Sequence, residues 1–188
     1  MMPGLKFELP DLACRPEAAI FPLIGEVELA ELVADIRARG LLSPIVLHHD
    51  GTILDGRNRY AAMRAIGQEP RYQTWRGPGT ELEYVISQNL RRRHLNESQR
   101  AMVASRIANM RRGGDRRSDQ AANLPVGSVS QSKAAALMNV SERSVRDGSA
   151  VIERGDPKIV SLADRGKVSV AAAAEVARMA PEAQAGQI

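Results

Sequence analysis

The spacing of apolar residues changes along the chain in a way that predicts a mixed α+β protein. From Glu26 to Arg39 the apolar residues recur at helical spacing, and Gly40 follows as a C-terminal cap. Two short apolar runs, Ile45–Leu47 and Thr52–Leu54, predict strands, and the Asp50-Gly51 pair between them is typical of a hairpin turn. A helix is expected from about 58 to 66, and a further strand within 71–75. Residues 1–22, rich in proline, are expected to be a lead-in with at most one edge strand.

Two capping signatures mark the next helices. Thr80-x-x-Glu83 predicts a helix that continues to about Asn89, and Asn96-x-x-Gln99 predicts the start of another. Trp75, just before the first of these, is interpreted as a core or edge anchor rather than a platform for stacked bases. We therefore expect an N-terminal α+β domain over residues 1–95 with a small mixed sheet, and an all-helical domain over residues 96–188.

A helix-turn-helix is predicted at about residues 130–153. Gln131–Met138 and Glu142–Glu153 have helical spacing, Asn139-Val140-Ser141 forms the turn, and Val145 is the expected buried anchor. Many such motifs have glycine where this chain has Asn139, but asparagine also tolerates a positive φ. The second helix is expected to present Glu142, Arg143, Ser144, Arg146 and Asp147 outward, and a last helix is expected from the cap Ser169 to Met179.

Positive charge is concentrated between Arg91 and Arg117. This range contains nine arginines and only two acidic residues, although the whole chain has a net charge of only +4. Such a segment indicates a polyanionic partner, here double-stranded DNA, or else a solvated helix face. The stretch 111–127 is rich in glycine and arginine and is interpreted as a flexible basic linker. The expected DNA contacts are Gln131, Ser132, Ser141, Arg143, Ser144 and Arg146 in the helix-turn-helix, with Arg111, Arg112, Arg116 and Arg117 in the linker.

Composition limits the other possibilities. Of 188 residues, 44% are hydrophobic and 3% aromatic, so the core must consist of aliphatic residues and methionine. Cys14 is the only cysteine, which excludes an internal disulfide, and the three histidines lack metal-ligand spacing. His48-His49 is expected to be solvated at a strand end. There is no signal peptide and no apolar run long enough to cross a bilayer, so we expect a cytoplasmic protein with no membrane partner.

The stretch Asp55-Gly56-Arg57-Asn58-Arg59 joins a predicted strand to a predicted helix. The free N–H groups at the start of a helix favour anions, Gly56 permits a close approach to the backbone, and the two arginines suit phosphate oxygens. One interpretation is a phosphate-binding turn. The alternative is an ordinary turn with solvated arginines.

Two motifs in this order resemble the ParB/sulfiredoxin superfamily over roughly Phe21 to Met179. The family's Gly-Glu-Arg-Arg-x-Arg-Ala corresponds to Gly56-Arg57-Asn58-Arg59-Tyr60-Ala61-Ala62, and its Glu-Asn-x-x-Arg corresponds to Gln88-Asn89-Leu90-Arg91-Arg92. The resemblance implies a ParB-type DNA-binding protein that acts in partition of a plasmid, phage or chromosome or in transcriptional regulation. It also implies that the protein works as a homodimer.

The resemblance also implies CTP, or another nucleoside triphosphate, with Mg²⁺ as the switch ligand. The implied nucleotide-binding residues are Gly56, Arg57, Asn58, Arg59, Gln88, Asn89 and Arg92, with Asn89 at the metal. The family has arginine where this chain has Asn58 and Ala61, and glutamate where it has Gln88. A glutamine can act neither as a charged group nor as a base, so we expect at most weak CTP hydrolysis.

The resemblance raises three alternatives to this switch, of which the first is not expected. Sulfiredoxin activity is not expected, because Arg57 stands where those enzymes have their reactive cysteine. A ParB-fold enzyme such as a nucleotide-dependent kinase or a nuclease is the second alternative. The third is a DNA-binding regulator that has lost its ligand.

Overall fold

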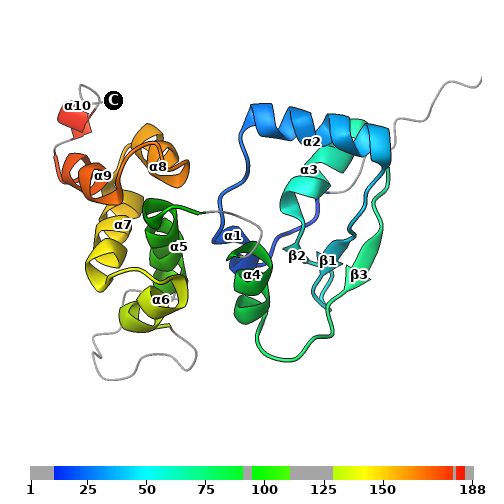
Figure 1. The fold of residues 1–188 in the computed structure, drawn as a ribbon, viewed down its shortest axis with the longest axis horizontal. Helices are drawn as coiled ribbons and strands as arrows, with labels where there is room; N and C mark the ends of the chain where they lie inside the picture. The colour runs from blue at the N-terminus through cyan, green and yellow to red at the C-terminus, as the bar shows by residue number, and fades with distance from the viewer. Residues whose placement is uncertain (1–10, 91–94, 111–128, 180, 185–188) are drawn as a thin grey trace, which may run out of the picture. The chain divides into compact units, whose positions relative to one another are not determined.

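The computed structural model describes residues 11–90, 95–110, 129–179 and 181–184. The chain forms two compact units, Met1–Arg92 and Arg93–Ile188, and each is described here by itself. Strands occur in the first unit, while the described elements of the second are all helices (Figure 1). The small mixed sheet and the α+β class predicted from the sequence are confirmed.

The sheet of the first unit has three short strands in the order β2-β1-β3. β1 (Ile45–Leu47) pairs antiparallel with β2 (Ile53–Asp55) and parallel with β3 (Tyr72–Thr74). The hairpin between β1 and β2 was predicted from Asp50-Gly51, and the strand expected at Thr52–Leu54 is shifted by one residue. The parallel pairing follows from α3, which lies between β2 and β3 in sequence and lets the chain return in the same direction as β1.

Helices cover both faces of this sheet. α2 (Glu26–Arg39) packs against α3 (Arg57–Ile66), and their apolar residues share a core with Ile45 and Ile53. On the opposite face α4 (Glu81–Leu90) and the short α1 (Pro16–Ala19) both pack against β2. α1 was missed in the proline-rich lead-in, where Pro16 occupies the first helical position.

The predicted caps are present. Thr80 N donates to Glu83 Oε2 at 2.9 Å, and Glu83 N donates to Thr80 Oγ1 at 3.3 Å. Asn96 and Gln99 make the same reciprocal pair at the start of α5 (Glu97–Asn109), with distances of 3.0 and 2.9 Å. These sequence signatures therefore located two helix starts correctly.

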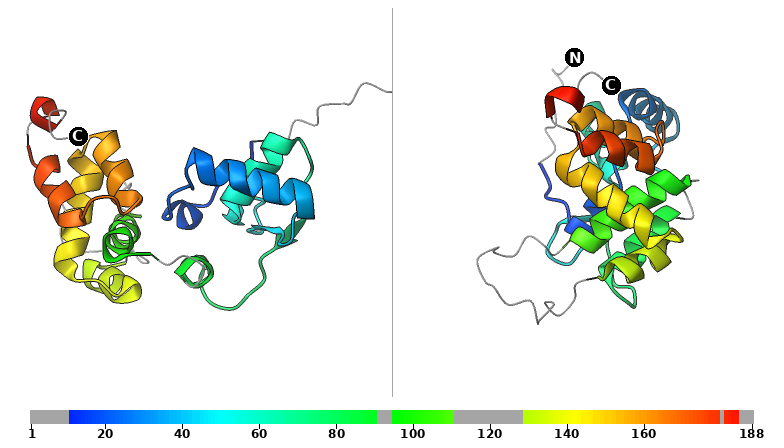
Figure 2. Two further views of the ribbon diagram at one scale, coloured as in Figure 1. Left: turned by 45° about the horizontal axis from the view of Figure 1, so that its top comes forward. Right: turned by 90° about the vertical axis from the view of Figure 1, so that its left-hand side faces the viewer.

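In the second unit α5 is the central helix. It packs against α6 (Gln131–Met138), α7 (Glu142–Arg154), α8 (Pro157–Asp164) and α9 (Val170–Ala177) (Figure 2). The final short helix is α10 (Pro181–Gln184). Neither α8 nor α10 was predicted, although Asp156 caps α8 and a proline opens it, a combination that marks a helix start.

α5 and α7 approach each other closely because each has a small residue where the two helices cross, Ser105 on α5 and Gly148 on α7. The hydroxyl of Ser105, fully buried, lies 2.8 Å from the carbonyl oxygen of Ala101 and 2.7 Å from that of Val145. A Cβ added to Gly148 would overlap the Ser105 hydroxyl and lie 3.1 Å from the Ala101 carbonyl oxygen. Gly148, which lowers the helix propensity of α7, is thus required by packing.

None of the helices in the described part of the chain is both long and apolar enough to cross a bilayer.

Candidate functional site

The turn between β2 and α3 depends on Gly56. Its φ of 100° and ψ of 20° lie in the left-handed region that favours glycine, and Gly56 is the N-cap of α3. The carbonyl of Gly56 accepts the N–H of Tyr60 at 2.8 Å, so the helix is regular from its first turn. The first backbone N–H groups of α3, which have no partner within the helix, therefore lie at this turn, as predicted from the sequence.

Arg57 and Asn58 hold the segment that follows α1. Arg57 Nη1 donates to the carbonyls of Ala18 at 3.1 Å and Phe21 at 3.2 Å. The side-chain oxygen of Asn58 accepts the N–H of Ile24 at 3.3 Å. Both side chains are half-buried, so the alternative of solvated arginines does not hold for Arg57.

Arg59 turns back over Gly56. Its Nη2 donates to the Pro44 carbonyl at 3.1 Å and to Asp55 Oδ2 at 3.0 Å, and the side chain is only 17% exposed. A Cβ built on Gly56 would lie 2.9 Å from Nη2, so any other residue would have to displace the Arg59 guanidinium. Arg59 Nε is buried and has no hydrogen-bond partner among the described residues.

The second motif lies on α4. The side-chain nitrogen of Asn89 donates to the carbonyl of Val85 at 2.9 Å, one turn earlier in the same helix, and Gln88 and Asn89 are both half-buried. α4 packs on β2, the strand that leads into Gly56, so both motifs are attached to the same strand. Arg92 lies outside the described residues. No cluster of three or more His, Cys, Asp or Glu side chains suited to a metal occurs in the described ranges.

His48 is buried, and the expectation that it is solvated is wrong. Its side chain is 5% exposed because the hairpin folds against the first turn of α4. Nε2 lies 3.2 Å from Glu81 Oε1, and Nδ1 lies 3.0 Å from Asp50 Oδ1 in a contact that is electrostatic rather than hydrogen-bonded. His49 is exposed and its ring centroid lies 3.7 Å from that of His48.

The two acidic groups beside His48 have lowered pKa values. Hydrogen bonds from the Thr52 side chain and backbone hold the pKa of Asp50 well below its usual range, with a smaller contribution from His48. A hydrogen bond from its own backbone N–H lowers the pKa of Glu81, and the charges of Arg15 and His48 add to this effect. The loop and helix start are therefore arranged to hold carboxylates in the charged form.

The second candidate site is the pair α6 and α7. Asn139, between them, has φ 50° and ψ 57°, the left-handed conformation expected there. Ser130 caps α6 by accepting Lys133 N at 3.2 Å, and Ser141 caps α7 by accepting Ser144 N at 3.0 Å. The turn between the two helices is thus held by the left-handed Asn139 at the end of α6 and by the Ser141 cap at the start of α7.

The predicted DNA-contacting residues of this pair differ in exposure. Ser132, Ser141, Arg143 and Arg146 are exposed, whereas Gln131 and Ser144 are half-buried. Asp147, expected to face outward, is instead 8% exposed and pairs with Arg178 of the α9 end at 2.6 Å. The other four arginines of the prediction, Arg111, Arg112, Arg116 and Arg117, lie outside the described residues, as does the whole segment 111–127.

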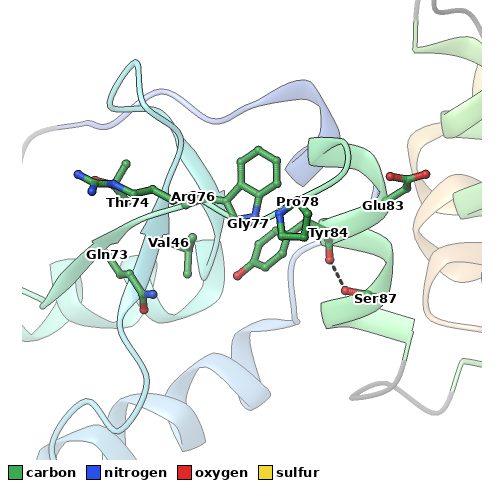
Figure 3. A pocket seen from close by; sticks show the side chains of 10 residues that line it. Val46, Gln73, Thr74, Arg76, Gly77, Pro78, Glu83, Tyr84 and Ser87 are labelled. Atoms are coloured by element: carbon green, nitrogen blue, oxygen red, sulfur yellow. Dashed lines mark hydrogen bonds between the residues drawn. The ribbon is translucent and has the colours of Figure 1, made fainter.

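A hollow that the sequence did not indicate lies beside β3. Its volume is about 690 Å³, and its walls come from β1, β3, the loop after β3 and the outer side of α4 (Figure 3). The rings of Trp75 and Tyr84 stand in it with centroids 5.7 Å apart and an interplanar angle of 40°. Trp75 is therefore an edge residue that is half-buried in an open hollow.

No protein-family model matches the chain, and no curated protein matches it. Among solved structures it is similar to the C-terminally truncated chromosome-partitioning protein ParB from Caulobacter crescentus complexed with CTP-γ-S, with 21% identity, 88% of each chain covered and a TM-score of 0.34. The same protein complexed to the centromeric parS site gives 18% identity, 96% and 88% coverage and a TM-score of 0.39. A Pnob8-like ParB-N domain gives 18% identity, 88% and 75% coverage and a TM-score of 0.48.

Proposed function

We propose that this chain is a ParB-like DNA-binding protein in which α6 and α7 form a helix-turn-helix, with α7 as the recognition helix. The assignment of α7 as the recognition helix rests on the placement of Arg143 and Arg146. Both are exposed in the first half of α7, whose opposite face is anchored by the fully buried Val145. Residues three apart lie on one face of a helix, so the two guanidinium groups can reach the same groove.

The charge partners of the arginines in this unit support the choice of these two. Arg106 makes a two-point ion pair with Asp164 at 2.8 and 2.6 Å, and Arg178 pairs with Asp147. Arg143 and Arg146, by contrast, make no ion pair with any described residue. Arginines that are exposed and unneutralised at the start of a capped helix suit base edges and phosphates.

We also propose that the turn at Gly56 binds a nucleoside triphosphate, with CTP and Mg²⁺ as the ligand implied by the motif resemblance. One observation fits an anion there: the buried Arg59 Nε lies beside Gly56 and has no hydrogen-bond partner among the described residues. Gly56, Arg57, Asn58 and Arg59 would hold the phosphates, together with Arg92 and Gln88. Asn89 would offer Mg²⁺ a neutral oxygen, with phosphate and water oxygens completing the shell.

The contacts of the arginines favour a second candidate, a DNA-binding protein without a nucleotide. Arg57 and Arg59 already donate to three backbone carbonyls and to Asp55, so they can serve the fold alone. The two candidates differ in one measurement. Calorimetry with CTP or ATP and Mg²⁺, with and without a pool of DNA fragments, should show binding only for the first.

The DNA-binding proposal is tested with the double variant Arg143→Ala, Arg146→Ala in anisotropy titrations of labelled duplexes selected from a random pool. We expect a loss of about 1–3 kcal/mol for each arginine that reads a base, and a shallower salt dependence for each that contacts a phosphate. Arg165→Ala is the matched control, because it removes one exposed arginine at the end of α8 in the same unit. Binding equal to that of the parent in the double variant would contradict the assignment of α7.

A further inference from the structure

The free edge of the sheet lies at β3. The strand order β2-β1-β3 places β3 on the outside, and all three of its residues are exposed (Figure 1). Among the described residues no element pairs with its outer side. Unpaired N–H and C=O groups at a strand edge are a template for another extended chain.

The hydrogen bonds between β1 and β3 show which backbone N–H and C=O groups of β3 point to the outer edge. Ile45 N donates to the Arg71 carbonyl at 2.9 Å, and Trp75 N donates to the Leu47 carbonyl at 2.7 Å. In a parallel pair the residues that bond the neighbour alternate, so Gln73 also faces β1. The N–H and C=O groups of Tyr72 and Thr74 therefore point away from the sheet.

The hollow lies on one face of this same edge. Val46 and Gln73 are register partners whose side chains share a face, and both line the hollow. Tyr84 and Ser87 of α4 form another part of its wall, and Trp75, whose ring centroid lies 5.7 Å from that of Tyr84, lines it as well. A strand added at β3 would direct every second side chain toward this face and over the hollow.

A cation, Arg76, stands at the end of this edge and is itself one of the residues that line the hollow. Figure 3 shows the side chain of Arg76 extending toward Thr74, away from Tyr84. Arg76 is exposed and makes no ion pair with a described residue. An acidic side chain on an added strand would meet this guanidinium while its apolar neighbours face the hollow.

We propose that β3 and the adjacent hollow form a docking site for an extended peptide that alternates apolar and acidic residues. The peptide adds a strand to the sheet through the backbone of Tyr72 and Thr74. Its apolar side chains enter the hollow beside Trp75, and its acidic side chains pair with Arg76. This site is distinct from both the turn at Gly56 and the α6–α7 pair.

The chain has a single tryptophan, so its fluorescence reports on this hollow alone. The probe is a capped six-residue peptide that alternates leucine and glutamate, used at concentrations where it is monomeric. We expect saturable changes in Trp75 fluorescence, with slower amide exchange at Tyr72 and Thr74 but not at Gln73. A peptide of the same composition with its leucines and glutamates in separate blocks should bind about tenfold more weakly or worse.

Two N-methylated forms of the probe test the backbone pairing. Alternate N–H groups of a strand point to opposite edges, so methylation of either the leucine or the glutamate nitrogens blocks one edge only. We expect one form to lose at least about tenfold in affinity and the other to bind like the parent, and the form that fails reports the strand direction. Any other pattern overturns the proposal.

Thr74→Pro removes the outward N–H without touching a bond to β1, and proline is tolerated at such edge positions. Thr74→Val is the matched control, because it keeps the N–H. The proline variant should weaken the probe about tenfold and the valine variant should not. Absence of any fluorescence change up to the order of 1 mM probe would overturn the proposal. So would concentration-dependent exchange protection of Tyr72 and Thr74 without the probe, since a second copy of the chain would then occupy the edge.

Discussion

Asp55 and Arg59 face each other across the turn at Gly56, with Oδ2 and Nη2 3.0 Å apart. Their side chains are 10% and 17% exposed, so each largely neutralises the other inside the first unit. A phosphate at this turn would compete with Asp55 for the same guanidinium.

Arg59→Ala should weaken nucleotide binding about tenfold or more, the scale of one charge-assisted hydrogen bond of about 1.5–3 kcal/mol. The same change should lower the free energy of unfolding, because it removes a charged hydrogen bond from the buried Asp55. Calorimetric titration with CTP and Mg²⁺ measures the first effect and urea unfolding the second. Arg64→Ala, at the exposed end of α3 where Arg64 pairs with Asp11, is the control for both. Loss of stability without any change in nucleotide affinity would show that Arg59 serves the fold alone.

Gln88→Glu should raise the rate of nucleotide hydrolysis if the turn binds a triphosphate. A carboxylate can accept a proton from water, whereas the glutamine amide cannot. Phosphate release at saturating CTP measures the effect, and Gln88→Ala, which supplies no base, should remain at the parent rate. Equal rates for the glutamate and alanine variants would contradict a catalytic position for residue 88.

Helices and strands whose ends depend on neighbouring residues were predicted well from the sequence. The bounds of α2, the hairpin at Asp50-Gly51 and the cap at Asn96 all follow from contacts within a few residues. α1 was missed because it is a single turn whose place depends on Arg57, a residue far along the chain.

The chemistry of the site was harder to predict because it depends on distant pairs. Nothing in the order of residues shows that Arg59 bonds Pro44, that His48 meets Glu81, or that Asp147 turns inward to Arg178. Residue type suggested a phosphate ligand for Arg59, and the fold adds a competing partner for the same group. The hollow at Trp75 forms only when α4 folds beside β3, so no local pattern could have revealed it.

Gly148→Ala should destabilise the second unit by about 1–3 kcal/mol, although alanine is the better helix former, because the added methyl group overpacks the crossing of α5 and α7. Ser105→Ala should cost about 1 kcal/mol through the lost hydrogen bond at the buried carbonyls. The double variant should lose less than the sum, because removal of the hydroxyl makes room for the methyl group. Thermal unfolding of all four proteins measures this, and simple additivity would contradict direct contact between the two sites.

Asn139→Gly should preserve or raise stability, whereas Asn139→Ala should lower it by about 1 kcal/mol. The reason is the left-handed conformation of this residue, which glycine adopts freely and alanine does not. DNA affinity should be unchanged in the glycine variant, since the turn that places α7 is kept. Equal stability of the glycine and alanine variants would show that the turn relaxes to another conformation in solution.

The carboxylates around His48 should make the first unit sensitive to acid. Asp50 and Glu81 have lowered pKa values in the folded chain, so the stabilisation they supply is complete above their unfolded pKa values and is lost as the pH falls through the folded ones. With unfolded values of about 4, the loss should begin below about pH 5 and continue toward pH 2. Urea unfolding followed between neutral pH and about pH 3 should therefore show a smaller pH dependence for Glu81→Gln than for the parent. Glu31→Gln, an exposed position on α2, is the matched control and should leave the slope unchanged. A Glu81→Gln profile that follows the parent at every pH would show that the contact between Glu81 and His48 does not contribute to stability in solution.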